Sequence, residues 1–263
     1  MIQIILSLVL LASSQSIFAS DQKSDESQEL EKKLADPVAD ITSIPLQFNY
    51  GFDDENSSMF TVFNLQPVFS GSSDQWLFVN RFVTSYITAE TETDSGSIQS
   101  AGFGDFTYQL YVTPKELSSV KVAAGFLLAA PTGMDQGISS GKWGLGPTFA
   151  MIGTTSQSTY GGLIYQNWSV AGDKERKDVS LLTVQPIFSY RMGNLWSVSP
   201  FNNITFDKTL DGEKWNVPMG LQFSKLMLRP FVPVHGTVGV FSNVIHPQNA
   251  PAWTLKLQMN FVL

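Results

Sequence analysis

The sequence Pro251-Ala252-Trp253-Thr254-Leu255-Lys256-Leu257-Gln258-Met259-Asn260-Phe261-Val262-Leu263 alternates between apolar and polar side chains. The apolar members share one parity, the polar members share the other, and Val262 is the exception. Successive side chains of a β-strand point to opposite faces of its sheet, so this stretch predicts a strand with one apolar and one polar face. Both backbone edges of such a strand need partners, and the closing position of a β-barrel supplies them.

The composition of the whole chain favours a transmembrane β-barrel. Charged residues make up 15% of the 263 residues, against about 25% in soluble domains, and aromatic residues make up 12%. The mean hydropathy is nevertheless only +0.02. A barrel wall has this mixture, because about half of its strand residues meet lipid and about half meet water. A helical membrane protein would need runs of about 20 apolar residues, and none follows the N-terminal stretch.

Charge and motif content argue against nucleic-acid binding and against enzyme chemistry. The net charge is −7, whereas phosphate binding needs clustered Lys and Arg. The chain has no cysteine, no phosphate-binding loop and no zinc or calcium motif, so no cofactor and no metal site is expected. The two histidines, His235 and His246, have no catalytic motif around them, so no catalytic residue is assigned.

The first residues predict an export signal. Ile2–Leu11 is apolar and is followed by Ser-Gln-Ser-Ile-Phe-Ala at 14–19. This pattern predicts a secretory signal peptide over 1–19, with cleavage after Ala19. No Lys or Arg precedes the apolar run, so a short membrane anchor stays open as the alternative.

Residues 20–43 predict a polar periplasmic segment ahead of the barrel. Within it, Leu30, Leu34 and Val38 recur at the i, i+4 and i+8 positions, which predicts a short helix over 30–36. Two interpretations remain open for this segment. It either docks on or inside the mouth of the barrel, or it is a flexible lead.

From residue 44 to residue 263 the pattern changes to strand periodicity and predicts one outer-membrane β-barrel domain. The fold class is all-β, an antiparallel up-and-down transmembrane barrel of about twelve strands with a short N-terminal segment. The predicted strands cover 44–52, 59–70, 75–87, 103–113, 120–130, 142–153, 159–170, 178–191, 195–207, 213–226, 230–244 and 252–263. An even number of strands is typical of such barrels.

The connections between these strands favour the same fold. With both termini in the periplasm, the odd-numbered connections are extracellular and tend to be long, and the even-numbered ones are short turns. The two longest predicted connections, Thr88–Gly102 and Pro131–Gly141, are both odd-numbered. Pro147 and Pro218 lie inside predicted strands and require β-bulges, because proline removes a ladder hydrogen bond.

Side-chain parity divides the strand residues between lipid and lumen. The residues expected to line the lumen and to select solutes are Gln47, Asn49, Asn64, Gln66, Arg81, Asp105, Gln109, Gln185, Lys256, Gln258 and Asn260. The three charged members belong inside, because Lys or Arg in mid-bilayer costs about 2–4 kcal/mol. Two interpretations of these charges remain open: ion pairs that fill a narrow lumen, or a constriction that filters solutes by charge and hydrogen bonding.

Three stretches of the sequence resemble recurring blocks of a known family. They are Leu34–Asn49 (LADPVADITSIPLQFN), Gly141–Thr148 (GKWGLGPT), and Trp168–Asp173 (WSVAGD) with Asp178-Val179. The family consists of bacterial outer-membrane β-barrels that are regarded as transporters and grouped with the MetA-type proteins of phenol-degradation pathways. The resemblance implies a barrel in a Gram-negative outer membrane that takes up small molecules, aromatic or apolar ones among them. It carries over no catalytic or ligand-binding residue.

These observations together predict an outer-membrane channel for passive diffusion of small solutes. The alternative is a structural or partner-binding barrel that acts through its extracellular loops, for which the acidic stretch Thr88–Gly102 is a candidate. The expected partners are outer-membrane lipid, a small solute of unknown identity and the barrel-assembly machinery, with no nucleic acid.

Overall fold

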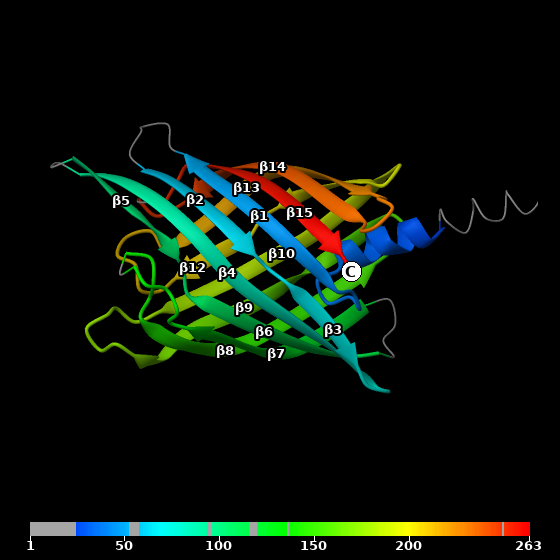
Figure 1. Cartoon of the computed structure of the whole chain (residues 1–263), viewed down its shortest axis with the longest axis horizontal. Coiled ribbons are helices and arrows are strands. Elements are labelled where there is room, and N and C mark those ends of the chain that lie inside the picture. The colour runs from blue at the N-terminus through cyan, green and yellow to red at the C-terminus, as the bar shows by residue number, and fades with distance from the viewer. Residues whose placement is uncertain (1–24, 53–57, 94–95, 116–119, 136, 249) are drawn as a thin grey trace, which may run out of the picture.

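The computed structural model describes residues 25–52, 58–93, 96–115, 120–135, 137–248 and 250–263. This part of the chain folds into one closed antiparallel β-barrel with a helix over residues 25–35 at one end (Figure 1). The strands are β1 (Ser43–Phe52), β2 (Ser58–Leu65), β3 (Val68–Ser72), β4 (Trp76–Thr93), β5 (Gly96–Phe103), β6 (Phe106–Pro114), β7 (Val120–Ala130), β8 (Lys142–Thr154), β9 (Ser158–Gly172), β10 (Ser180–Gly193), β11 (Trp196–Phe201), β12 (Ile204–Asp207), β13 (Trp215–Met227), β14 (Val234–Ile245) and β15 (Trp253–Val262).

The barrel closes between its first and last strands. β1 and β15 pair without interruption from Ser43↔Val262 to Phe52↔Trp253. β14 pairs with the other edge of β15, so the C-terminal strand has a partner on both sides. The remaining strands pair with their neighbours along the chain, and the pairing of β9 with β10 completes the ring.

The 15 strand segments make twelve passes across the barrel wall. Three passes are each broken once, at residues 66–67, 104–105 and 202–203. On both sides of each break the two segments pair with the same neighbour, as β2 and β3 do with β4. The prediction of a twelve-stranded up-and-down barrel is therefore confirmed.

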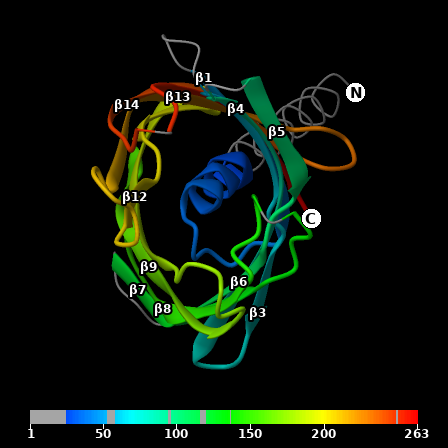
Figure 2. The same cartoon turned by 90° about the vertical axis from the view of Figure 1, so that its left-hand side faces the viewer.

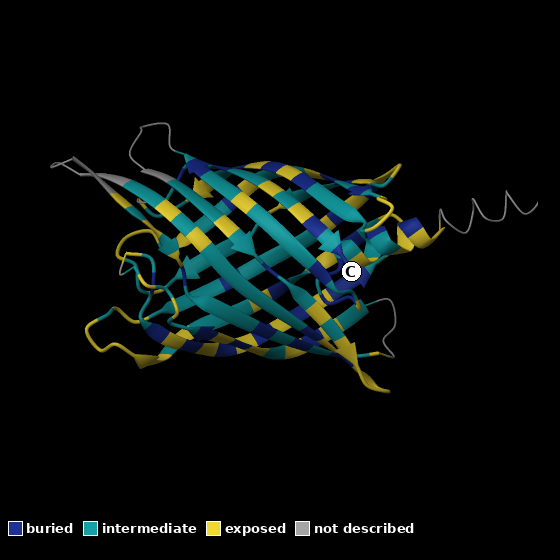
Figure 3. Ribbon diagram, viewed as in Figure 1, coloured by how far each residue is buried: buried dark blue, intermediate teal, exposed yellow. Residues whose placement is uncertain are grey.

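The barrel wall carries large apolar side chains outside, whereas its inner side combines polar side chains with a buried apolar cluster. In β8, Trp143, Leu145, Pro147, Phe149 and Met151 are exposed, and the residues between them are buried. The same alternation makes a chequered pattern over the outer surface (Figure 3). Soluble monomers rarely expose so much contiguous apolar surface, whereas in a transmembrane barrel this surface faces lipid.

Tryptophans are the first or second residues of strands at both ends of this apolar surface. Trp76 and Trp196 lie at the end with the helix and the C-terminus, and Trp143, Trp215 and Trp253 lie at the opposite end. Aromatic belts of this kind lie at the two membrane–water interfaces. By the usual topology of such barrels, the end with the helix and the C-terminus is periplasmic and the other end is extracellular.

The prediction of a loop over Thr88–Gly102 is wrong. β4 and β5 continue as a paired hairpin from Tyr86↔Phe103 to Thr93↔Gly96. The β-branched threonines of this stretch favour a strand. Acidic residues between them hid that preference in the sequence.

The two prolines that required bulges behave differently. Pro218 lies at a shift of register between β13 and β14, so the bulge predicted there is confirmed. Pro147 pairs in register with Phe126 of β7, and the ladder to β9 skips Gly146 and Pro147 without a shift. The bulge predicted at Pro147 is therefore wrong, because the ladder absorbs the missing N–H without an extra residue.

The N-terminal segment lies within the outline of the barrel at its periplasmic end (Figure 2). Its helix covers residues 25–35, and residues 36–42 connect it to β1. Val38 and Ala39 in this connection are 0% and 1% exposed. The predicted signal peptide over 1–19 lies outside the described residues.

Candidate functional site: the barrel lumen

The lumen contains a cavity of about 550 Å³. Inward-facing residues of the barrel wall surround it, and Leu34, Asp36 and Pro37 of the N-terminal segment border it. Ten of the eleven residues expected in the lumen border this cavity, namely Gln47, Asn49, Asn64, Gln66, Arg81, Gln109, Gln185, Lys256, Gln258 and Asn260. Asp105 is not among the residues that border it.

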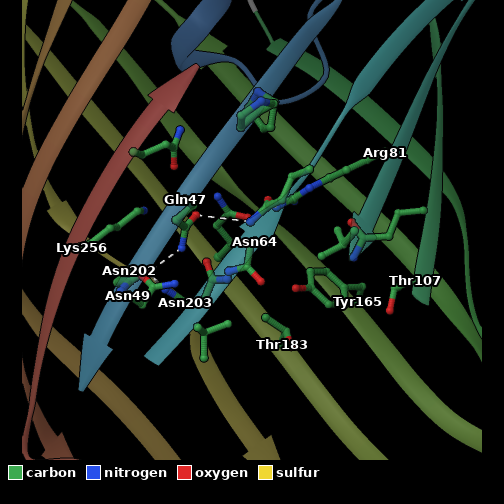
Figure 4. Close-up of a pocket in the computed structure, with 18 of the residues that line it drawn as sticks. Gln47, Asn49, Asn64, Arg81, Thr107, Tyr165, Thr183, Asn202, Asn203 and Lys256 are labelled. Carbon is green, nitrogen blue, oxygen red and sulfur yellow. Dashed lines mark hydrogen bonds between the residues drawn. The ribbon is translucent and has the colours of Figure 1, made fainter. Parts of the chain in front are cut away.

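A chain of hydrogen bonds runs along the cavity wall from β4 to β1 (Figure 4). Arg81 Nη2 donates to Gln66 Oε1. Gln66 Nε2 donates to Gln47 Oε1 at 3.4 Å, and Gln47 Nε2 donates to Asn49 Oδ1 at 3.0 Å. Asn49 is the cross-strand partner of Lys256. Three carboxamide side chains therefore connect Arg81 to Asn49, and Asn49 lies opposite the second cation, Lys256.

The described strands present an excess of positive charge to the lumen. Their inward-facing cations are Arg81, Lys121, Lys142, Arg191 and Lys256. Their acidic residues are Glu90, Glu92 and Asp207, all at the extracellular ends of strands. Of these five cations, Arg81 and Lys256 border the cavity, whereas Lys121 and Lys142 are paired with Asp36 and Asp178. A local excess of one sign of charge between low-dielectric walls concentrates ions of the opposite sign.

Asp105 is held by the extracellular segment of residues 131–141. Its Oδ1 accepts from Ser139 Oγ at 2.6 Å and from the backbone N–H of Gly133 at 3.2 Å. Its Oδ2 accepts from the backbone N–H and the Oγ of Ser140 at 2.7 and 2.6 Å. In Figure 2 this segment lies over the extracellular opening, next to β6. Asp105 thus orders the extracellular rim instead of bordering the cavity.

These hydrogen bonds also change the pKa of Asp105. Burial by itself would raise the pKa of Asp105, but the bonds from Ser139, Ser140 and Gly133 lower the pKa below its ordinary value. The anchoring of the rim is therefore complete above the ordinary pKa, and it is lost as the pH falls through the lowered pKa.

The N-terminal segment fills the periplasmic half of the lumen on one side. Val38 packs in a cluster of lumen-facing side chains from β4, β6, β7, β8 and β9, namely Leu77, Val79, Tyr111, Ala123, Ala150, Ile152 and Leu163. Full burial of a valine side chain stabilises such a contact by about 1.5–3 kcal/mol. The lumen is therefore filled by side chains at this level.

Two acidic side chains of the segment face cations of the wall. Asp36 Oδ2 lies 2.6 Å from Lys121 Nζ, and Asp36 Oδ1 accepts from the N–H of Val38 at 3.0 Å. Glu31 is only 5% exposed and lies near Arg191. Its Oε1 has no hydrogen-bond partner among the described residues. The ion pair of Asp36 with Lys121 therefore stabilises the docked segment. Glu31 is buried, and among the described residues no hydrogen bond to its Oε1 replaces the water that this atom loses.

A second cavity, of about 180 Å³, lies beside the N-terminal helix. It shares Gln185, Lys256 and Asn260 with the larger cavity. Leu34 and Pro37 border both cavities. The N-terminal segment thus stands between two parts of one lumen.

The protonation of Glu31 should control how tightly the segment docks. Burial raises the pKa of Glu31, and the charge of Arg191 offsets this only in part. Docking is therefore favoured fully below the ordinary pKa of a glutamate, and it weakens as the pH rises through the raised pKa. We expect Glu31→Gln, which resembles the protonated form, to tighten docking at neutral pH.

The measurement is the rate at which a thiol reagent modifies Ala39→Cys, in a chain that has no other cysteine. The rate should be lower with Glu31→Gln than without it at neutral pH, and the two rates should converge in acid. Comparison at equal pH cancels the ionisation of the thiol itself. A faster rate with Glu31→Gln would show that the carboxylate of Glu31 helps docking.

Sequence reasoning missed the residues that close the lumen. Asp36 and Lys121 are 85 positions apart, and no local pattern connects them. Asn202 and Asn203 also border the cavity, because the wall breaks between β11 and β12 at these two residues. In the sequence, the recurrence of Leu30, Leu34 and Val38 at every fourth position was the one pattern that indicated a buried face in this segment.

The histidines and acidic residues are scattered over the described part of the chain. They contain no group of three or more His, Cys, Asp or Glu that could hold a metal ion. The ring nitrogen Nδ1 of His246 lies 3.0 Å from the carbonyl oxygen of Pro247, and His235 borders the smaller cavity. No helix in the described part of the chain is long and apolar enough to cross a membrane.

No protein-family model matches the sequence, and no curated protein is similar to it. Solved structures share its fold. The COG4313 outer-membrane channel from Pseudomonas putida F1 aligns with a TM-score of 0.60 and 14% identity, over 87% of this chain and 98% of that one. The NanC porin aligns with a TM-score of 0.50 and 9% identity, over 84% and 98% of the two chains.

The chain therefore has the fold of bacterial outer-membrane channel barrels, as the three sequence blocks implied. Within that class its wall resembles that of the COG4313 channel over almost the whole of both chains. At these identities the likeness concerns the fold, and it assigns no role to any residue.

Proposed function

We propose that the protein is a channel for passive diffusion of small solutes across the outer membrane of a Gram-negative bacterium, and that a signal peptide exports it. The observation that carries this proposal is a cavity of about 550 Å³, with polar residues as the majority of its lining, inside a barrel whose outer surface is apolar. Small barrels without a transport role can fill their interior with packed side chains.

The size and the lining of the cavity suit small organic molecules. Ligand sites for such molecules typically measure about 300–1,000 Å³. Carboxamides and hydroxyls border most of the cavity, and Phe60, Val62, Leu127 and Tyr165 give it an apolar part. This apolar part suits aromatic or apolar molecules. Lumen side chains replace the water around a solute by hydrogen bonds, so no cofactor and no energy source is needed.

The conformation described here is the closed one in this proposal. The N-terminal segment fills part of the lumen with Val38 and is fastened by the ion pair of Asp36 with Lys121. Passage of a solute requires this segment to leave the lumen or to shift within it. Since the segment lies at the periplasmic end, it can leave without passing through the barrel.

Purified full-length protein should give discrete conductance steps in planar bilayers. Liposomes that contain it should swell in solutions of small solutes and should not swell in solutions of polymers too large for the cavity. Conductance is expected because the cavity offers a polar path through an apolar wall. Bilayers that stay sealed at every voltage and pH, together with liposomes that do not swell, would contradict the proposal.

A second function is favoured by the free edge of β5. Within the described residues, β5 pairs with β4 alone, so its other edge leaves backbone N–H and C=O groups unpaired. Such edges can pair with an extended segment of another protein. A barrel that acts by binding a partner should lose that partner when residues 88–101 are deleted. A channel should keep or raise its solute flux after the same deletion.

A further inference from the structure

We infer that the lumen cavity binds small organic carboxylates, and that Arg81 and Lys256 are the groups that receive the carboxylate. This inference rests on the proposed channel function and names the class of solute. It concerns binding inside the lumen, so it can be tested without any measurement of conduction.

Arg81 and Lys256 are cations of the cavity that have no acidic partner. The salt bridges of the described residues join Lys32 to Glu29, Lys121 to Asp36 and Lys142 to Asp178. Asp36 is the one acidic residue among those described that border the cavity, and Lys121 already occupies it. Arg81 and Lys256 thus face the cavity without a paired counter-charge, and Lys33 of the N-terminal segment adds a further positive charge at its border, which favours an anion there.

The donors of both cations remain available to a ligand. Within the described residues, the guanidinium of Arg81 makes one hydrogen bond, to Gln66, although it carries five N–H groups. The ammonium of Lys256 makes none within the described residues. In Figure 4, Arg81 and Lys256 project from opposite sides of the view, with Gln47 and Asn64 between them. A carboxylate can take two parallel bonds from the planar guanidinium.

The other groups of the cavity favour a carboxylate over an inorganic oxyanion. A carboxylate keeps its two oxygens at one end of the molecule. The apolar side chains of Phe60, Val62 and Leu127 then suit the rest of the molecule.

The first experiment measures binding by calorimetric titration of detergent-solubilised full-length protein. The ligands are benzoate and its neutral isostere benzamide. We expect benzoate to bind at least about tenfold more tightly than benzamide. Arg81→Gln and Lys256→Gln should each reduce this preference, and the double variant should abolish it. Both changes keep a hydrogen-bonding side chain at the site.

Lys225→Gln is the matched control. It removes the same charge from the barrel, but Lys225 Nζ lies 4.7 Å from the ring centre of Trp196, which is exposed on the outer wall. The preference for benzoate should therefore stay unchanged in this variant. If benzoate binds no more tightly than benzamide, or if inorganic phosphate binds more tightly than benzoate, the inference is overturned.

The second experiment measures the reversal potential of the full-length protein in a bilayer with a KCl gradient. Wild-type protein should favour chloride, the double variant Arg81→Glu/Lys256→Glu should favour potassium, and Lys225→Glu should behave like wild type. Selectivity for potassium in the wild type would also overturn the inference. A protein that binds benzoate but never conducts contradicts only the channel, and one that conducts without preferring benzoate contradicts only the site.

Discussion

Deleting residues 25–40 should raise the single-channel conductance severalfold. The deletion removes the helix and Val38 from the lumen, and it joins two cavities of about 550 and 180 Å³ that Leu34 and Pro37 now separate. The barrel itself should persist, because β1 begins at Ser43 and keeps its pairing with β15 and β2. Heat-modifiable mobility on a gel, which reports a closed barrel, checks that persistence.

A matched pair of single substitutions tests the same effect in the full-length chain. Asp36→Asn removes the ion pair with Lys121, whose Nζ lies 2.6 Å from the carboxylate. The loss should cost about 1–3 kcal/mol of docking free energy, because the carboxylate is buried while the lysine is partly exposed. Asp40→Asn makes the same charge change in the same segment at an exposed position and should have no effect.

A reversible cross-link supplies the opposite perturbation. The chain has no cysteine, so Asp36→Cys/Lys121→Cys can be joined by a reducible bifunctional thiol reagent without side reactions. Cross-linking should abolish the conductance, and reduction should restore it. Equal conductance of the wild type, the deletion and the cross-linked protein would show that the segment does not obstruct the path.

Gly161→Val should prevent or severely impair folding of the barrel. Gly161 is the fourth residue of β9, paired with Ile152 on one side and Ile187 on the other, and its φ is +137°. A Cβ there would overlap the carbonyl oxygen of Met151. Backbone strain and overlap together should cost about 2–6 kcal/mol. The free energy of unfolding in urea, measured in lipid vesicles, reports this loss.

Gly71→Val is the control for that experiment. Gly71 is also a strand glycine, but a Cβ at this position meets nothing within 4 Å, and its φ is not positive. We expect its free energy of unfolding to change by less than about 0.5 kcal/mol. If both variants fold equally well, the conformation of Gly161 does not limit the stability of the wall.

The architecture could be predicted from the sequence because its signals are local. Side-chain parity fixes which face of a strand meets lipid, and turn residues mark where a strand ends. The strand predicted over 120–130 is β7 (Val120–Ala130), and the one predicted over 142–153 is β8 (Lys142–Thr154). The hairpin over Thr88–Gly102 was not predicted, because the acidic residues of this stretch resemble a loop although its threonines favour a strand.

The arrangement inside the lumen could be predicted only in part. Parity indicated which polar side chains point inward, and ten of those eleven border the cavity. Parity says nothing about depth or about contacts between distant segments. Asp105 was therefore placed with the lumen residues, although hydrogen bonds to Ser139 and Ser140 hold it at the rim. The pairing of Asp36 with Lys121 depends on the closed ring and on a docked segment together.

Residues 36–42 form a seven-residue linker between the helix and β1. Fully extended, seven residues span at most about 25 Å, so a released helix stays at the mouth of its own barrel. Its effective concentration there is in the millimolar range, as for other short flexible tethers. Re-closure is then an intramolecular event. The fraction of open molecules should consequently be the same at every protein concentration, and each molecule should close again after the solute has passed.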